Sequence, residues 1–121
     1  MKNIVFMTNI KDDNRINRSK PYEYSVKSWK QWCEKNDAEF FMLDEFIYEP
    51  DFMKPKWDIL FVFDLLEHND IKYNQIAVVD ADTIVHPNCP NFFEMTENKF
   101  CAVPVHGSMD WVCRSMENYS K

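Results

Sequence analysis

Three short, uninterrupted apolar runs constrain the fold of this chain more than any other feature. They are Ile4–Met7, Phe40–Leu43 and Ile76–Val79. A strand with one solvated face alternates apolar and polar residues, whereas a strand of a parallel sheet is covered on both faces and is apolar throughout. The three runs therefore predict three buried parallel strands.

The segments between these runs have helical character. Pro21–Lys35 carries one apolar stripe at spacings of four, three and four residues: Tyr22, Val26, Trp29 and Cys33. Pro55 is suited to the first turn of a second helix. The residues that follow, from Trp57 to Leu66, are apolar nearly all round, which predicts a helix buried on every side.

The order strand, helix, strand, helix, strand predicts an α/β fold. We expect one domain over residues 1–121, built as a Rossmann-like, mostly parallel sheet with flanking helices and with the first strand in the middle. Phe100–Val103 is a candidate further strand. Asp110–Tyr119 is a candidate last helix with Asp110 as its N-cap.

Ligands of doubly wound sheets bind beyond the carboxyl ends of the strands. The first strand ends at Thr8 and Asn9, and the third runs into Asp80 and Asp82. With the first strand in the middle, we expect Thr8 to lie beside Asp80. Topology therefore indicates a binding site at this end of the sheet.

Composition excludes several classes of protein. The only glycine is Gly107, so neither a G-x-G-x-x-G fingerprint nor a Walker loop is present. The net charge of −6 argues against a nucleic-acid partner. No apolar run reaches the roughly 18 residues of a transmembrane helix. The four cysteines form no C-x-x-C pair, and without an export signal we expect free thiols and a cytoplasmic location.

Asp80 and Asp82 carry the most informative chemistry. Residues two apart in an extended chain project to the same side. Two carboxylates so placed repel each other unless a cation lies between them. Hard oxygen ligands suit Mg²⁺ or Mn²⁺, which also accept phosphate oxygens. A metal here would let an acidic protein without a glycine loop bind a diphosphate.

The stretch YNQIAVVDADTIVHPNCPNFFE, which contains Asp80 and Asp82, resembles the D-x-D region of glycosyltransferases with the GT-A fold. The resemblance extends back through KWDILFVFDLLE and NIVFMTN, over residues 1 to about 105. It implies glycosyl transfer from a nucleotide-diphosphate sugar, with a UDP-sugar as the expected donor and Mn²⁺ or Mg²⁺ as cofactor.

The resemblance also implies roles for single residues. Asp82 would be the main metal ligand, and Asp80 would contact the metal, the donor ribose or both. Thr8 and Asn9 would contact the nucleoside, and Asp44 would contact the base. Lys56 would contact the phosphates or the sugar. His106 is a weaker candidate for the metal.

Members of that family carry an acceptor-binding half after the motif. We expect this half to be absent here, which leaves the acceptor and the catalytic residues unassigned. The apolar side chains of the last helix would then meet another chain, in a homo-oligomer for example: Trp111, Val112 and Met116.

Other interpretations remain open. The chain could be a non-catalytic nucleotide-sugar-binding module, or a phosphatase of the haloacid dehalogenase type with Asp80 as nucleophile. Against the phosphatase, Ile84 stands where that motif has Thr or Val, and the motif ends the third strand instead of the first. The two aspartates could also only solvate a strand end, with Asp44 as a turn residue and Lys56 as a surface lysine. Five aromatic residues are expected in the core: Trp29, Trp32, Trp57, Phe61 and Phe63.

Overall fold

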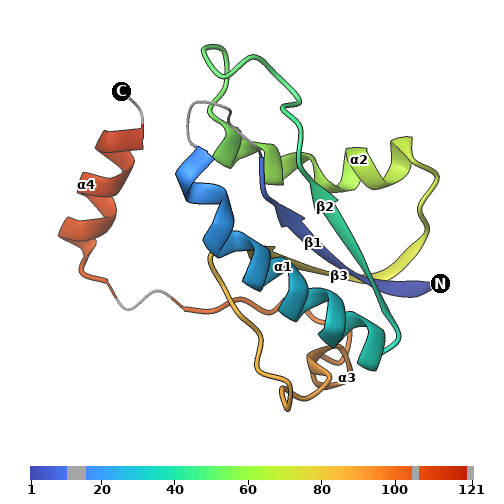
Figure 1. Cartoon of the computed structure of the whole chain (residues 1–121). Helices are drawn as coiled ribbons and strands as arrows, with labels where there is room; N and C mark the ends of the chain where they lie inside the picture. The colour runs from blue at the N-terminus through green and yellow to red at the C-terminus, as the bar shows by residue number, and fades with distance from the viewer. Residues whose placement is uncertain (11–15, 105–106, 120–121) are drawn as a thin grey trace.

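The computed structural model describes residues 1–10, 16–104 and 107–119 of the chain. Its strands and helices follow the predicted order (Figure 1). They are β1 (Lys2–Thr8), α1 (Ile16–Lys35), β2 (Ala38–Leu43), the 3-10 helix η2 (Pro55–Phe61), α2 (Val62–His68), β3 (Tyr73–Asp80), α3 (Phe92–Met95) and α4 (Met109–Tyr119). No helix in the described ranges is long and apolar enough to cross a membrane.

The strands form a small open sheet in the order β2-β1-β3, and both pairings are parallel. The three arrows in Figure 1 point the same way, toward the start of α1. The predicted α/β class, strand order and strand direction are therefore confirmed. Helices cover both faces of the sheet, but only the central strand β1 is fully buried along its apolar run. β2 and β3 are half-buried, and Val78 is 46% exposed, so the prediction of three buried strands is correct for β1 alone.

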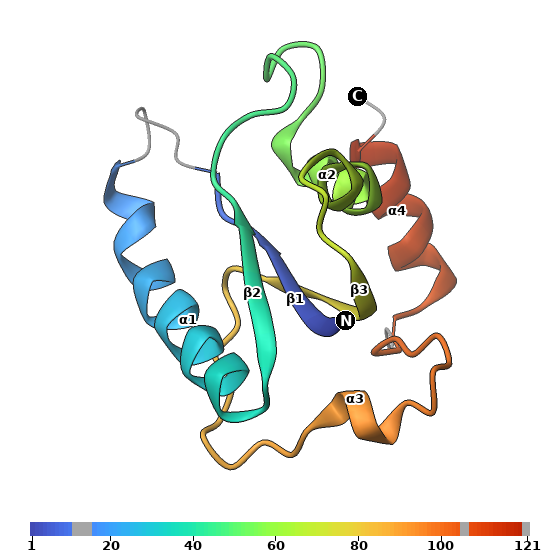
Figure 2. The ribbon, with the colours of Figure 1, turned by 90° about the vertical axis from the view of Figure 1, so that its right-hand side faces the viewer.

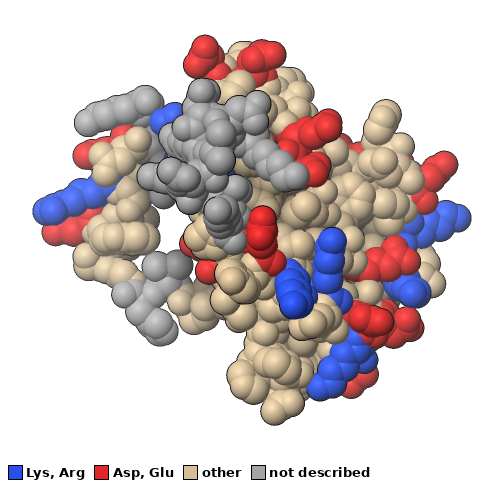
Figure 3. All heavy atoms as spheres, viewed as in Figure 1, with Lys and Arg blue, Asp and Glu red and all other residues tan. Residues whose placement is uncertain are grey.

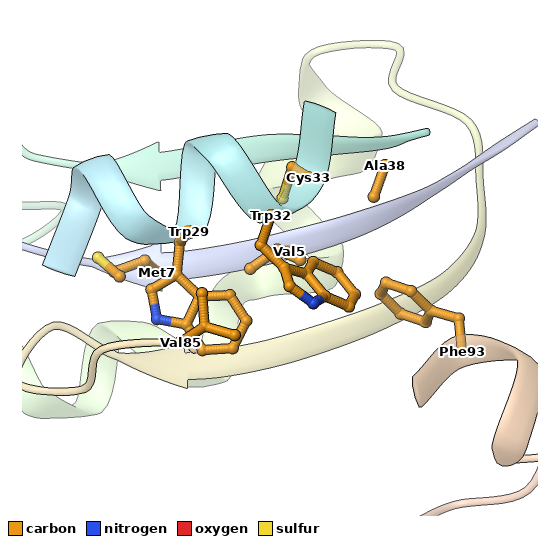
Figure 4. Close-up of a cluster of buried hydrophobic side chains, with 8 residues drawn as sticks. All are labelled: Val5, Met7, Trp29, Trp32, Cys33, Ala38, Val85 and Phe93. Carbon is orange, nitrogen blue, oxygen red and sulfur yellow. The ribbon is translucent and has the colours of Figure 1, made fainter. Parts of the chain in front are cut away.

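The two faces of the sheet are covered by different helices, α1 on one side and α2 on the other (Figure 2). Alternation along β1 sends Val5 and Met7 toward α1, and Ile4 and Phe6 toward α2. All four side chains are at most 1% exposed, so β1 is the centre of the core. The cluster on the α1 face is drawn in Figure 4: Val5, Met7, Trp29, Trp32, Cys33, Ala38, Val85 and Phe93.

The second helix is not buried on every side, so that prediction is wrong. It begins as a 3-10 helix, and Trp57, Leu60 and Phe63 are 41%, 66% and 60% exposed. Val62 and Leu66 are buried against the sheet. One sheet face can cover only one side of a helix, which leaves the other apolar side in contact with solvent.

The predicted fourth strand is also wrong. Phe100–Val103 has no strand conformation, and Phe100 and Val103 are 95% and 91% exposed. A short apolar run becomes a strand only when a neighbouring strand pairs with it. The described residues offer this segment no such partner.

The last helix forms as predicted but begins one residue earlier than expected. The hydroxyl of Ser108 accepts a hydrogen bond from the Trp111 amide at 3.3 Å, so Ser108 caps α4 and Asp110 lies in its first turn. α4 stands apart from the sheet in Figure 1. Trp111 and Met116 are 55% and 66% exposed, in line with the expected apolar surface.

Helices in this glycine-poor chain end on acidic or amide residues in the left-handed conformation. Asp37, Asp70, Glu97 and Asn98 have φ angles of 52°, 55°, 50° and 58°. After α2, the amides of Asp70 and Ile71 bond to carbonyls of the last turn at 3.0 and 2.9 Å. This is the Schellman arrangement, in which glycine is the usual left-handed residue.

Candidate functional site

The carboxyl end of the sheet brings together three of the predicted site residues. Thr8 is the direct ladder partner of Asp80 on β3 and of Leu43 on β2. Asp44 follows Leu43 and is exposed. The expected neighbourhood of Thr8 and Asp80 is therefore confirmed, with Asp44 on the opposite side of β1.

Thr8 and Asp80 also project to the same face of the sheet. Along β1, Thr8 continues the side of Ile4 and Phe6, which pack under α2. Along β3, Asp80 continues the side of Ile76, which packs in the same cluster. The half-buried Thr8 hydroxyl and the exposed Asp80 carboxylate thus start from one side, where η2 and α2 lie.

Asp82 lies in a tight turn that is closed by Thr83. The Thr83 amide donates to the Asp80 carbonyl at 3.2 Å, and the Thr83 hydroxyl donates to the same carbonyl at 2.6 Å. Asp80 and Asp82 are both exposed. The turn therefore presents both carboxylates to solvent from a backbone that is held at each end.

Side chains of α1 form hydrogen bonds with the segment that follows this turn and hold it against the helix. Ser28 Oγ accepts from the Val85 amide at 3.2 Å, and Lys35 Nζ donates to the Pro87 carbonyl at 2.9 Å. The indole N–H groups of α1 add two further bonds, from Trp29 to Thr83 Oγ1 at 3.1 Å and from Trp32 to the Cys89 carbonyl at 3.0 Å. Figure 4 shows both indoles reaching from α1 over the sheet, Trp29 toward Val85 and Trp32 toward Phe93.

Asn9 and Lys56 are placed less directly. The Asn9 amide extends the β1–β2 ladder by donating to the Leu43 carbonyl at 2.9 Å, and its side-chain amide lies 3.9 Å from the Met42 sulfur. Lys56 lies in the first turn of η2, with its ammonium 5.9 Å from the centre of the Trp57 ring. Asn9 therefore borders the sheet end, and Lys56 begins the helix that covers the Thr8 side.

The described residues contain no group of three or more His, Cys, Asp or Glu side chains arranged to hold a metal ion. Asp80 and Asp82 form a pair of carboxylates without a third such ligand among them. His106, the weaker candidate, lies outside the described residues. His86 is exposed, and its Nδ1 accepts from the Asn88 amide at 3.0 Å within a local turn.

Acidic side chains gather near this end of the molecule. Some are visible at the top of the view in Figure 3, where the 44–54 loop lies. That loop carries four exposed acidic residues: Asp44, Glu45, Glu49 and Asp51. On the same face, basic side chains lie interspersed with acidic ones. An anionic ligand approaching this region meets negative charge, so a bound cation would assist it.

No family model, curated protein or solved structure matches this chain. The side chains at the carboxyl end of the sheet are therefore the basis for assigning a function.

The sequence prediction missed one buried carboxylate near this region. Asp58 of η2 is 1% exposed, and neither of its oxygens has a hydrogen-bond partner of regular geometry. Burial raises the pKa of Asp58 above its usual value, and the nearby backbone amide of Ile47 partly opposes this rise. An acidic residue inside an apolar helix pattern is the only sequence signal that could have identified it.

The Trp29–Thr83 contact was also missed. Trp29 was expected in the core, where it lies, but its hydrogen bond joins residues 54 positions apart. No spacing rule connects residues that meet only when a helix and a loop pack on the same sheet.

Proposed function

We propose that this chain is the donor-binding portion of a metal-dependent glycosyltransferase and binds a nucleotide-diphosphate sugar at the carboxyl end of its sheet. The observation that carries the proposal is the position of the Asp80–Asp82 turn directly after β3, with Asp80 paired to Thr8 of the central strand. Ligands of α/β sheets are found at this end.

The two carboxylates fit a divalent metal that keeps several water or phosphate ligands. Mg²⁺ and Mn²⁺ are commonly held by one or two carboxylates, with water and phosphate oxygens completing the coordination. A pair of exposed carboxylates without a third protein ligand in the described ranges suits such a site better than an all-protein cage. Asp80 and Asp82 would hold the ion, which would neutralise charge on the leaving diphosphate.

The neighbouring residues have roles that follow from their positions. Thr8 and Asn9 end the central strand and would contact the nucleoside. Asp44, on the β2 side, would contact the base. Lys56 is exposed at the start of η2 and would contact the phosphates or the sugar. These roles keep the diphosphate near the motif and the nucleoside over β1 and β2.

A thermal-shift panel tests the proposal. The chain is titrated with UDP-, GDP- and CDP-sugars, each in Mn²⁺ and in EDTA. A ligand at 100 times its Kd stabilises a folded protein by about 2.7 kcal/mol, which raises the midpoint by several degrees. We expect stabilisation by a UDP-sugar in Mn²⁺ and none in EDTA. Equal stabilisation in Mn²⁺ and in EDTA would contradict the proposal, and so would the absence of any stabilisation in Mn²⁺.

The same preparation separates the other interpretations. Release of the nucleotide diphosphate on incubation with acceptors or water indicates transfer, whereas tight binding without release indicates a binding module. A covalent phosphate trapped on Asp80 would instead identify a phosphatase.

A further inference from the structure

We infer that Trp29 is a positioning residue for the Asp80–Asp82 turn and sets the affinity of the site for its metal–nucleotide ligand. This inference rests on the proposed function, which makes the turn the metal site. Trp29 itself lies behind the turn in the core of the α1 face, 8% exposed.

The connection runs through two hydrogen bonds in series. The Trp29 indole N–H donates to the Thr83 hydroxyl at 3.1 Å, and that hydroxyl donates to the Asp80 carbonyl at 2.6 Å. The indole donor leaves the hydroxyl proton free for a single acceptor, which is the backbone of the motif. Trp29 therefore fixes the rotamer of Thr83, and Thr83 closes the turn around Asp82.

The indole is itself held on two sides. Its ring lies edge-on to Trp32 and to Phe92, with ring centres 6.0 and 6.3 Å away. Such packing restricts the rotamer of a large aromatic side chain. The packed core on the α1 face thereby restrains a turn whose own two carboxylates are exposed.

A turn held in this way would keep Asp80 and Asp82 in their binding positions even without a ligand. Without the indole donor, the Thr83 hydroxyl can rotate, and mutual repulsion of the carboxylates favours other arrangements of the turn. Each such arrangement must be reordered on binding, which lowers affinity. Groups that orient metal ligands without touching the metal commonly change affinity by about 10- to 100-fold.

Trp32 offers a matched control. It lies on the same helix, is 2% exposed, belongs to the same cluster and also donates its indole N–H, to the Cys89 carbonyl at 3.0 Å. That bond ties the segment six residues beyond Thr83 and does not reach the turn. Replacing either Trp by Phe removes one N–H donor and retains an aromatic ring.

The experiment compares Trp29→Phe and Trp32→Phe by two readouts. The first is the Mn²⁺-dependent affinity for UDP, and the second is amide hydrogen exchange of Thr83 without any ligand. We expect Trp29→Phe to weaken UDP binding about tenfold and to speed exchange of the Thr83 amide. Trp32→Phe should leave both readouts near wild type.

Thr83 variants keep the inference testable if Trp29→Phe folds poorly. Thr83→Val removes the hydroxyl at similar shape and should reproduce both effects. Thr83→Ser retains the hydroxyl and should restore wild-type behaviour. Equal exchange and equal affinity in Trp29→Phe, Thr83→Val and the wild type would overturn the positioning role.

The exchange readout separates the two proposals. If the wild type binds no UDP in Mn²⁺ but Trp29→Phe still speeds exchange at Thr83, the proposed function is wrong and the positioning of the turn stands. If the wild type binds UDP and both Trp variants weaken it equally, the effect is a general one of the core and the inference is wrong.

Discussion

Thr8 and Asp80 are direct partners in the parallel ladder of β1 and β3, and each is the last residue of its strand. Because paired residues of parallel strands project to the same side, a hydroxyl and a carboxylate extend from the same face at one corner of the sheet. The corner lies beside the η2 and α2 face, and Asp82 follows it by two residues.

Removal of one carboxylate from this corner should abolish metal-dependent binding. We predict that Asp82→Asn loses the joint stabilisation by Mn²⁺ and UDP-sugar, about 2 to 3 kcal/mol at 100 times the Kd. The unfolding midpoint of the ligand-free protein should be unchanged or slightly higher, because repulsion from Asp80 is relieved. Thermal melts with and without Mn²⁺ measure both effects.

Glu34→Gln is the control for this variant. It makes the same change of charge at an exposed position of α1 and should bind like the wild type. Wild-type binding by Asp82→Asn would remove the main support for the metal site.

Asp58→Asn should stabilise the protein at neutral pH. The raised pKa of Asp58 means that the folded state disfavours its charged form, so stability is lost as the pH rises above about 3.8. An amide of the same shape avoids the burial of charge, and we expect a gain of about 1 kcal/mol at pH 7. The gain should shrink below pH 4, where the carboxyl is protonated in both states. Urea denaturation of both proteins across this range tests the idea, and a loss at pH 7 would show that the carboxylate has a favourable partner.

Cys33 should make the protein sensitive to alkaline pH. Burial raises the pKa of its thiol from 9.0 to about 11, and the side chain is 2% exposed. Between pH 9 and 11 the unfolded chain ionises this thiol while the folded chain does not. Stability therefore falls across that window, by on the order of 2 kcal/mol.

Thiol labelling checks the same environment. Cys101 and Cys113 are exposed and should react in the native protein, whereas Cys33 should react only on unfolding. Labelling of Cys33 at the rate of Cys101 in the native state would contradict its burial.

The apolar side of α4 should contribute little to the stability of an isolated chain. Trp111 and Met116 are 55% and 66% exposed. We predict that changing either to Ala alters the free energy of unfolding by less than about 0.5 kcal/mol at low protein concentration. A larger loss that grows with protein concentration would identify a second copy as the partner of α4.

The sequence predicted the sheet because each strand carries its own signal. Ile4–Met7 is buried on both faces and Ile76–Val79 pairs beside it, so a parallel ladder places Thr8 beside Asp80 without further information. The burial of single side chains could not be predicted in this way. Leu60 is as apolar as Leu66, but only Leu66 faces the sheet. Likewise, Phe100–Val103 is apolar enough for a strand but finds no strand to pair with among the residues that the structure describes.

The candidate site was predictable only where it follows from topology. The position of Asp80 and Asp82 follows from the end of β3, whereas the support from Trp29 depends on how α1 packs against a loop 54 residues away. The burial of Asp58 could not be predicted for a related reason. The apolar pattern around it predicts a helix but does not show on which side of that helix Asp58 lies.

The left-handed residues at the helix ends have a consequence for the unfolded chain. Asp37 and Asp70 adopt φ angles of 52° and 55°, where a side chain is strained and glycine is not. A chain with one glycine and six prolines samples fewer backbone conformations when unfolded than a chain with glycine at each of these turns. Because the unfolded chain has fewer conformations to lose, the conformational entropy lost on folding is smaller. This smaller entropy loss offsets the strain at the left-handed positions.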